Sequence, residues 1–226
     1  MSPARVRARR GEGDKLREEI LVAVSDLLDE TNDEAAVSIR AIADRVGVTP
    51  PSIYRHFEDK EAMLAAVCAV VFVKLTDGIT EAAAAATSPI EALAEAGRCY
   101  VEFGLEHPEH YRLVFMRSYK DEMVDHSELR PVLEGGEIPE SHPLFSGDAL
   151  AGSQAFKALY DLVDAVLVAL PKRRRPDVFT TTTSMWTAMH GITSLRISKP
   201  DFVWPPIEDQ VEAIIWPWRE AVRAAE

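Results

Sequence analysis

Cysteines, export signals and long apolar runs are scarce in this sequence. Its two cysteines, Cys68 and Cys99, have no metal-ligand spacing. Reduced, buried thiols in a cytosolic protein are expected, with a redox pair as the alternative. No apolar stretch approaches the length that spans a bilayer, so no membrane contact is expected. The first residues, MSPARVRARRGEG, are charged but no apolar run follows them, which argues against a signal peptide.

Signatures of enzyme chemistry are also missing. The chain has no GxSxG, P-loop, HExxH or glycine-rich dinucleotide turn. No catalytic residue, cofactor or metal site is therefore expected. His107 and His110 stand beside Glu106 and Glu109, a composition that raises the possibility of a metal site. The favoured interpretation is a helix cap whose charges are solvated.

Basic residues are fewer than acidic ones, 25 Lys and Arg against 37 Asp and Glu, so the formal net charge is −12. Residues 1–60 contain ten Lys and Arg against twelve Asp and Glu, whereas the remaining residues contain fifteen against twenty-five. The acidity therefore lies mainly in the C-terminal three quarters. Residues 1–14 are expected to be a disordered basic arm with arginines at 5, 7, 9 and 10. That arm is either a solvated tail or an added contact to phosphates or the minor groove.

Apolar residues recur at helical spacing almost throughout, and no strand alternation or internal repeat is found. The sequence predicts an all-α fold, with an N-terminal three-helix helix-turn-helix head joined to a larger helical domain for ligand binding and dimerisation. The head is placed at residues 15–60 and the larger domain at 61–226. Residues 120–147 are polar and rich in Gly and Pro, which indicates a long loop or a partly helical lid.

The segment SIRAIADRVGVTPPSIYRHFEDK, Ser38 to Lys60, carries the strongest functional signal. Two short helices are expected around a tight turn at Gly47, which is the geometry of a helix-turn-helix. Tyr54, His56 and Lys60 place three polar donors around the apolar Phe57. Hydroxyl, imidazole and ammonium donors suit a helix end that lies against a phosphate backbone.

Residues 15–65, and above all the blocks IADRVGV, IYRHF and DKEAML, resemble the DNA-binding head of the tetracycline-repressor (TetR) family. The resemblance implies that Ser38 contacts a phosphate and that Arg40 reaches a base edge. It further implies that the recognition helix presents Thr49, Pro50, Pro51 and Ser52 to the groove, while Tyr54, His56 and Lys60 hold the DNA backbone. Pro50 cannot donate a side-chain hydrogen bond, so direct readout is expected to depend on Arg40, Ser52 and DNA shape.

The segment SMWTAMHGITSL resembles a TetR subgroup with a Trp, His and Gly signature in its C-terminal domain. A small apolar or amphipathic effector is expected between the helices predicted at 89–107, 148–170 and 176–198. For any single residue, ordinary core packing remains the alternative, and this holds for His190 too. The candidate ligand-binding residues are Phe103, Tyr111, Phe115, Met116, Phe156, Tyr160, Trp186, Met189 and His190.

Helices 148–170 and 176–198 are apolar on nearly all sides, which favours burial against a second copy. One such face comprises Leu162, Ala165, Val166 and Ala169, and another comprises Met185, Ala188, Ile192 and Leu195. A homodimer is therefore expected. The function predicted is a cytoplasmic, ligand-responsive regulator, expected to be a repressor, that binds a palindromic double-stranded operator. A helical protein–protein adaptor without DNA binding is the alternative.

Overall fold

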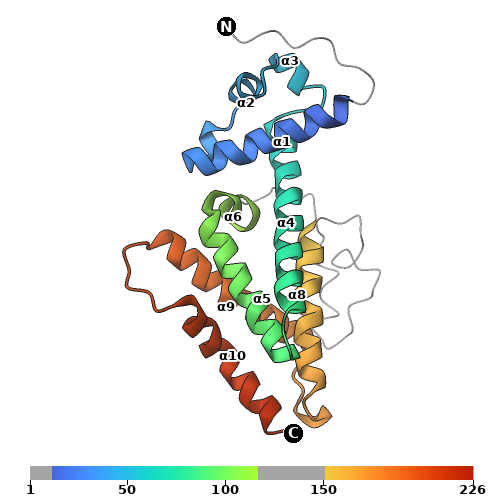
Figure 1. The fold of residues 1–226 in the computed structure, drawn as a ribbon, viewed down its shortest axis with the longest axis vertical. Coiled ribbons are helices and arrows are strands. Elements are labelled where there is room, and N and C mark those ends of the chain that lie inside the picture. The colour runs from blue at the N-terminus through green and yellow to red at the C-terminus, as the bar shows by residue number, and fades with distance from the viewer. Residues whose placement is uncertain (1–11, 117–150, 226) are drawn as a thin grey trace. The chain divides into compact units, whose positions relative to one another are not determined.

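A computed structural model of the protein describes residues 12–116 and 151–225. Within these stretches every regular element is a helix, which confirms the predicted all-α class (Figure 1). The described residues form two compact units, residues 12–71 with 107–116 and residues 72–106 with 151–225. Residues 1–11 of the predicted arm, with its four arginines, and the loop predicted at 120–147 lie outside the described residues. The expectation of disorder was wrong for residues 12–14, because they form the first turn of α1. The functional boundary placed at residue 60 remains a prediction.

Unit 1 is built from short helices around a small apolar core. Helix α1 (Glu12–Thr31) packs against α2 (Ile39–Val46) and α6 (Pro108–Phe115), and α2 packs against α3 (Pro50–Ile53). A single 3-10 turn, η1 (Glu34–Ala36), joins α1 to α2. The fully buried side chains of this unit include Ile20, Val24, Leu28, Ile42, Ile53 and Tyr111.

Unit 2 is a helical bundle in which α5 (Pro89–Glu106) is central. It packs against α8 (Ala151–Val168), α9 (Val178–Ser198) and α10 (Ile207–Arg223), and α8 also packs against α9. The turn between α8 and α9 contains η3 (Lys172–Arg174). A Cβ atom on Gly97 would lie 3.2 Å from Met189 Sδ and 3.4 Å from Val211 Cγ1, so a glycine lets α9 and α10 approach α5 closely.

Helix α4 (Lys60–Ala84) begins in unit 1 and ends in unit 2. It corrects the expectation that no stretch reaches membrane-spanning length, because its 25 residues are long and apolar enough by length and composition. The buried core helix of a soluble protein passes the same test. Its buried positions, including Met63, Val67, Val71 and Leu75, follow helical spacing, while Lys74 and Asp77 are exposed. This one-sided pattern is typical of a helix that packs on protein.

The apolar faces predicted for α9 are only partly available to a second copy. Met185 and Ile192 are buried within unit 2, whereas Leu195 is 51% exposed. Of the faces expected to meet a second copy, Met185 and Ile192 on α9 and Val166 on α8 are therefore already covered within unit 2. The cause is that α9 packs against both α5 and α8, so its buried side is wider than a single stripe.

Candidate functional site

The turn between α2 and α3 is set by two local signals that the sequence carries. Ser38 precedes α2, and its hydroxyl accepts a hydrogen bond from the Ala41 amide at 3.2 Å. Gly47 ends α2 in the left-handed conformation, with φ of 76° and ψ of 35°. Its amide and the Val48 amide both donate to the carbonyl of Ala43, at 3.0 and 2.9 Å. A residue without Cβ adopts this conformation readily, so the chain reverses sharply into α3.

The two helices bury one side and expose the other. Ile42, Ala43, Ile53 and Phe57 are buried beneath them. The residues expected to face DNA are accessible. Ser38, Arg40, Thr49, Pro50, Pro51 and Tyr54 are exposed, and Ser52, His56 and Lys60 are partly exposed. The structure thus brings all nine predicted DNA-contacting residues to the accessible surface of unit 1, which is the minimum that a contact requires.

The start of α3 is held by side-chain contacts rather than by a conventional cap. Thr49 occupies the N-cap position but its side chain accepts no capping hydrogen bond. Its Oγ1 lies 3.3 Å from Ser52 Oγ, which also accepts a hydrogen bond from Arg55 Nη2 at 3.0 Å. Arg55 is exposed and was missing from the predicted set. The signal was present in IYRHF, where Arg55 stands between two residues that were chosen.

Lys60 has a structural partner as well as a predicted one. Its ammonium group donates to the Glu34 carbonyl at 2.8 Å, which ties the first residue of α4 to η1. An ammonium group has three N–H donors, so this bond leaves donors for a phosphate. Asp59 precedes α4, and its carboxylate accepts a hydrogen bond from the Ala62 amide at 2.7 Å.

An ion-pair cluster joins α1 to the end of α2. Arg45 donates to Glu30 at 2.7 Å and lies 3.5 Å from a carboxylate oxygen of Asp26. The hydrogen bond from Arg45 lowers the pKa of Glu30, and the same bond raises the pKa of Arg45. All three side chains are at least partly exposed, so the cluster orients two helices more than it stabilises the fold.

The predicted ligand-binding residues do not all belong to one unit. Tyr111, Phe115 and Met116 lie in unit 1, where Tyr111 is fully buried and its ring centroid is 5.0 Å from that of Phe115. Met116 is 52% exposed. The remaining candidates lie in unit 2. They are Phe103 on α5, Phe156 and Tyr160 on α8, and Trp186, Met189 and His190 on α9.

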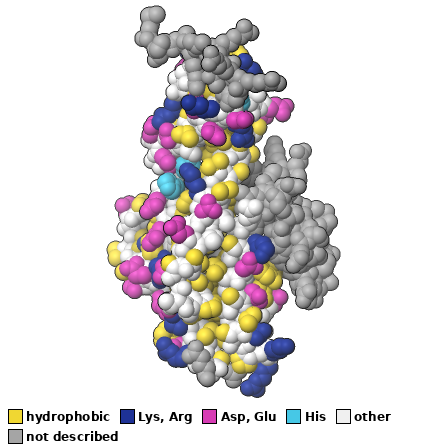
Figure 2. Space-filling model, turned by 45° about the vertical axis from the view of Figure 1, so that its right-hand side comes forward, with side chains coloured by type: hydrophobic (Ala, Val, Ile, Leu, Met, Phe, Trp, Pro, Cys, Tyr) yellow, Lys and Arg dark blue, Asp and Glu magenta, His cyan; other side chains and the backbone are white. Residues whose placement is uncertain are grey.

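An aromatic cluster forms between α8 and α9. The Phe156 ring meets Trp186 edge-on at 6.2 Å between centroids and lies 5.9 Å from Phe179. Trp186 is 39% exposed, so its indole is accessible from outside the bundle. On the face of the molecule in Figure 2, exposed hydrophobic side chains lie among acidic and basic ones.

His190 is partly buried one turn after Trp186. Loss of solvent around its ring lowers the pKa of His190, which favours the neutral imidazole near pH 7. A neutral imidazole both donates and accepts hydrogen bonds. Such a ring can therefore hydrogen-bond to a polar group of an otherwise apolar ligand.

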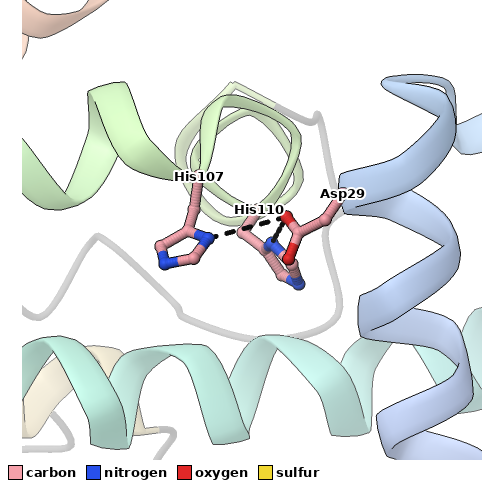
Figure 3. A group of neighbouring side chains, drawn as sticks. All are labelled: Asp29, His107 and His110. Carbon is pink, nitrogen blue, oxygen red and sulfur yellow. Dashed lines mark ion pairs between the residues drawn. The ribbon is translucent and has the colours of Figure 1, made fainter.

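Asp29, His107 and His110 converge in unit 1 (Figure 3). The Oδ1 atom of Asp29 on α1 lies 3.0 Å from His110 Nδ1 and 3.6 Å from His107 Nδ1. The expected cap with solvated charges is wrong for His110 and Glu109, because both are buried. Nothing in the sequence indicated that Asp29, almost eighty residues before His107, would lie beside the two histidines.

Two family models match the chain. One, described as "Bacterial regulatory proteins, tetR family", matches residues 33–67. The other, described as "Tetracyclin repressor-like, C-terminal domain", matches residues 93–215, more than half of the chain. The chain therefore belongs to the tetR family of bacterial regulatory proteins.

Individual relatives agree with this assignment. The HTH-type transcriptional activator FasR of Mycolicibacterium smegmatis is 30% identical over 109 residues, which are 48% of this chain and 49% of that protein. The chain thus spans about half the length of this curated relative. The matched families and this relative are described as regulators, in agreement with the expectation that the protein is not an enzyme.

Solved structures share the fold over nearly the whole chain. A protein of unknown function from Rhodococcus sp. RHA1 has a TM-score of 0.70 at 21% identity, covering 92% of this chain and 95% of that chain. A TetR family transcription regulator from Marinobacter aquaeolei VT8 has a TM-score of 0.57 at 19% identity, covering 93% and 98%. At such identities the likeness concerns the fold alone.

Proposed function

We propose that the protein is a dimeric transcriptional regulator that binds a near-palindromic operator in double-stranded DNA and responds to a small effector. The observation that carries the proposal is that hydroxyl, guanidinium and imidazole donors on α2, on α3 and just after α3 are accessible, whereas the apolar residues of the same segment are buried. A short helix that follows a tight turn and presents such donors suits the major groove.

The roles on DNA follow from side-chain chemistry. Arg40 is exposed on the first turn of α2, and its planar guanidinium suits a bidentate contact to guanine. Tyr54, His56 and Lys60 suit phosphates and fix the register of the head. Arg55 adds a donor beside Ser52. Because the whole chain is acidic, binding depends on these local contacts, and affinity should fall steeply as salt rises.

Dimerisation is proposed through α8 and α9. Ala165 and Leu195 are exposed, and Leu162 and Ala188 are half-buried. These four residues are apolar and form the accessible part of the two faces. No described heavy atom lies within 4 Å of the position that a Cβ on Gly191 would take, so packing within unit 2 does not require a glycine there. Two such faces from each copy would form an isologous four-helix interface.

The effector region is proposed within unit 2, among α5, α8 and α9. The aromatic cluster of Phe156, Phe179 and Trp186 supplies apolar surface, and His190 supplies a neutral polar group. Such a lining suits an apolar or amphipathic molecule. A hundredfold release from DNA requires about 2.7 kcal/mol of preference for the non-binding state. Helix α4 links the two units covalently and is the proposed route of the change.

Repression by occlusion of the polymerase is the proposed mode of regulation in the cytoplasm. Activation is the second candidate, because the curated relative FasR is described as an activator. A reporter gene behind the chain's own promoter distinguishes the two, since deletion of a repressor raises expression and deletion of an activator lowers it.

DNA binding is tested by mobility shift with the chain's own promoter and with random DNA of equal length. Arg40→Ala should weaken specific binding by about 1–3 kcal/mol, roughly fivefold to 150-fold, and relax one base position. Tyr54→Phe and Lys60→Ala should weaken binding to every sequence. Arg223→Ala is the matched control, because it removes one exposed positive charge from the end of α10.

If the wild-type protein prefers its promoter no more than random DNA, the proposal is wrong and the protein-adaptor alternative gains support. If Arg223→Ala weakens DNA binding as much as Arg40→Ala does, the loss of affinity reflects the total charge of the protein. The proposed contact between Arg40 and a base is then refuted.

A further inference from the structure

The side chains of Asp29, His107 and His110 point toward a common centre (Figure 3). One ligand atom from each of the three residues can be chosen so that all lie within 4.8 Å of one another. His107 is the N-cap residue of α6, and His110 lies in its first turn, so the backbone presents both rings on one side. The rings meet edge-on, with centroids 5.6 Å apart.

We propose that these three residues bind a divalent first-row transition metal ion, with Zn²⁺ as the best match. Two imidazole nitrogens and one carboxylate oxygen are typical zinc ligands, and a water molecule would take the fourth position. In a tetrahedral site with bonds of about 2.0–2.1 Å, neighbouring ligand atoms lie roughly 3.3 Å apart. The measured separations from Asp29 Oδ1, 3.0 and 3.6 Å, lie on either side of that value.

Burial favours a metal over a simple ion pair. The side chain of His110 is 5% exposed, and an imidazolium in such a place loses most of its hydration. A metal ion supplies the positive charge opposite Asp29 while both imidazoles stay neutral. The half-exposed side chains of His107 and Asp29 leave a path by which the ion enters from solvent.

The site has a structural consequence for unit 1. Asp29 lies near the end of α1, the helix that packs on α2, whereas both histidines belong to the start of α6. A bound ion would therefore cross-link α1 to α6. The metal proposal does not rest on the proposed DNA binding, because it is tested without DNA.

Metal binding is tested with the full-length, tag-free protein after treatment with a chelator. We expect Zn²⁺ to bind with one-to-one stoichiometry in calorimetry, and Co²⁺ to give the intense visible bands of a tetrahedral site. Asp29→Asn and His107→Gln change half-exposed side chains and should leave the circular dichroism unchanged. Each should weaken Zn²⁺ binding by more than about tenfold. At one fixed micromolar Zn²⁺ concentration, the rise in melting temperature should be smaller in either variant than in the wild type.

Asp26→Asn is the matched control. Asp26 lies on α1 one turn before Asp29 and is 52% exposed, so removal of its charge should leave Zn²⁺ affinity unchanged. The proposal is overturned if no stoichiometric binding occurs at micromolar Zn²⁺. It is equally overturned if Asp29→Asn and His107→Gln bind Zn²⁺ as tightly as the wild type, because the ion would then be held elsewhere. It is also overturned if Asp26→Asn weakens Zn²⁺ binding as much as Asp29→Asn does.

Discussion

Gly47 offers the clearest test of how the helix-turn-helix is held together. Its φ of 76° lies in the left-handed region, and no described heavy atom lies within 4 Å of the Cβ that a substitution would add. The cost of Gly47→Ala is therefore conformational, without a steric clash. An L-residue in this region costs about 1–2 kcal/mol. Alanine also restricts the unfolded chain, which returns about 0.4–1 kcal/mol. The expected net loss is about 1 kcal/mol.

The loss should be confined to unit 1, and the chain allows the two units to be followed separately. All four tryptophans, at 186, 204, 216 and 218, lie in unit 2, so tryptophan fluorescence reports only on that unit. Amide hydrogen exchange reports on α2 and α3 directly. A loss of about 1 kcal/mol corresponds to roughly fivefold faster exchange through local opening. The fluorescence-detected unfolding of unit 2 should not change.

Gly47→Asn is the control, because asparagine tolerates the left-handed conformation better than alanine does. We expect faster exchange in Gly47→Ala than in Gly47→Asn. Equal protection in the alanine variant and the wild type would refute the argument from backbone conformation. Equal damage in both variants would point instead to a contact that the added side chain disturbs.

The remaining predictions concern the interface, the effector and the α1–α2 contact. Leu195→Glu should yield monomers in sedimentation and lose most operator affinity, because one head covers one half-site. Trp186→Ala should reduce the response to effector, with operator binding retained in its absence. Arg45→Gln should destabilise unit 1 near pH 7, and the defect should become smaller as the pH falls below the ordinary carboxyl range. Because the pKa of Glu30 is lowered in the folded state, its pairing with Arg45 stabilises the fold fully above the ordinary carboxyl pKa of about 4.3. That stabilisation is lost as the pH falls through the pKa that Glu30 has in the folded protein.

Each of these predictions has an outcome that contradicts it. A Leu195→Glu dimer with wild-type affinity would remove the proposed interface. A full effector response in Trp186→Ala would show that Trp186 is not part of the effector site. An Arg45→Gln defect of equal size at pH 3 and pH 7 would show that Arg45 acts through packing.

The sequence predicted well those features that depend on neighbouring residues. Ser38, Gly47 and Asp59 mark helix ends, because capping and left-handed turns are decided within about four residues. The same local information predicted which polar side chains of α2 and α3 would be accessible. Thr49 shows the limit of local information: a threonine directly before two prolines favours an N-cap, and Thr49 does occupy that position, but its side chain makes no capping hydrogen bond.

Features that join distant segments were not predictable from one sequence. The pairing of Arg45 with Glu30 and the convergence of Asp29 with His110 depend on how α1 crosses α2 and α6. Burial of Ile192 likewise depends on α9 meeting two helices. A helical pattern shows that a face is apolar, but whether a second copy or the same chain covers it is decided by tertiary packing.

The continuity of α4 makes the length of this helix as consequential as its composition. Each residue of an α-helix advances the axis by about 1.5 Å and turns it by about 100°. One residue inserted between Val71, the last residue of unit 1 in this helix, and Phe72 would thus rotate everything beyond it by more than a quarter turn. Leu75 and Ile79 would no longer lie on the same face of α4 as Val67 and Val71. Seven inserted residues would turn the helix by nearly two full turns and so restore the original alignment of its buried face. An insertion of seven residues in α4 should therefore be tolerated better than an insertion of one.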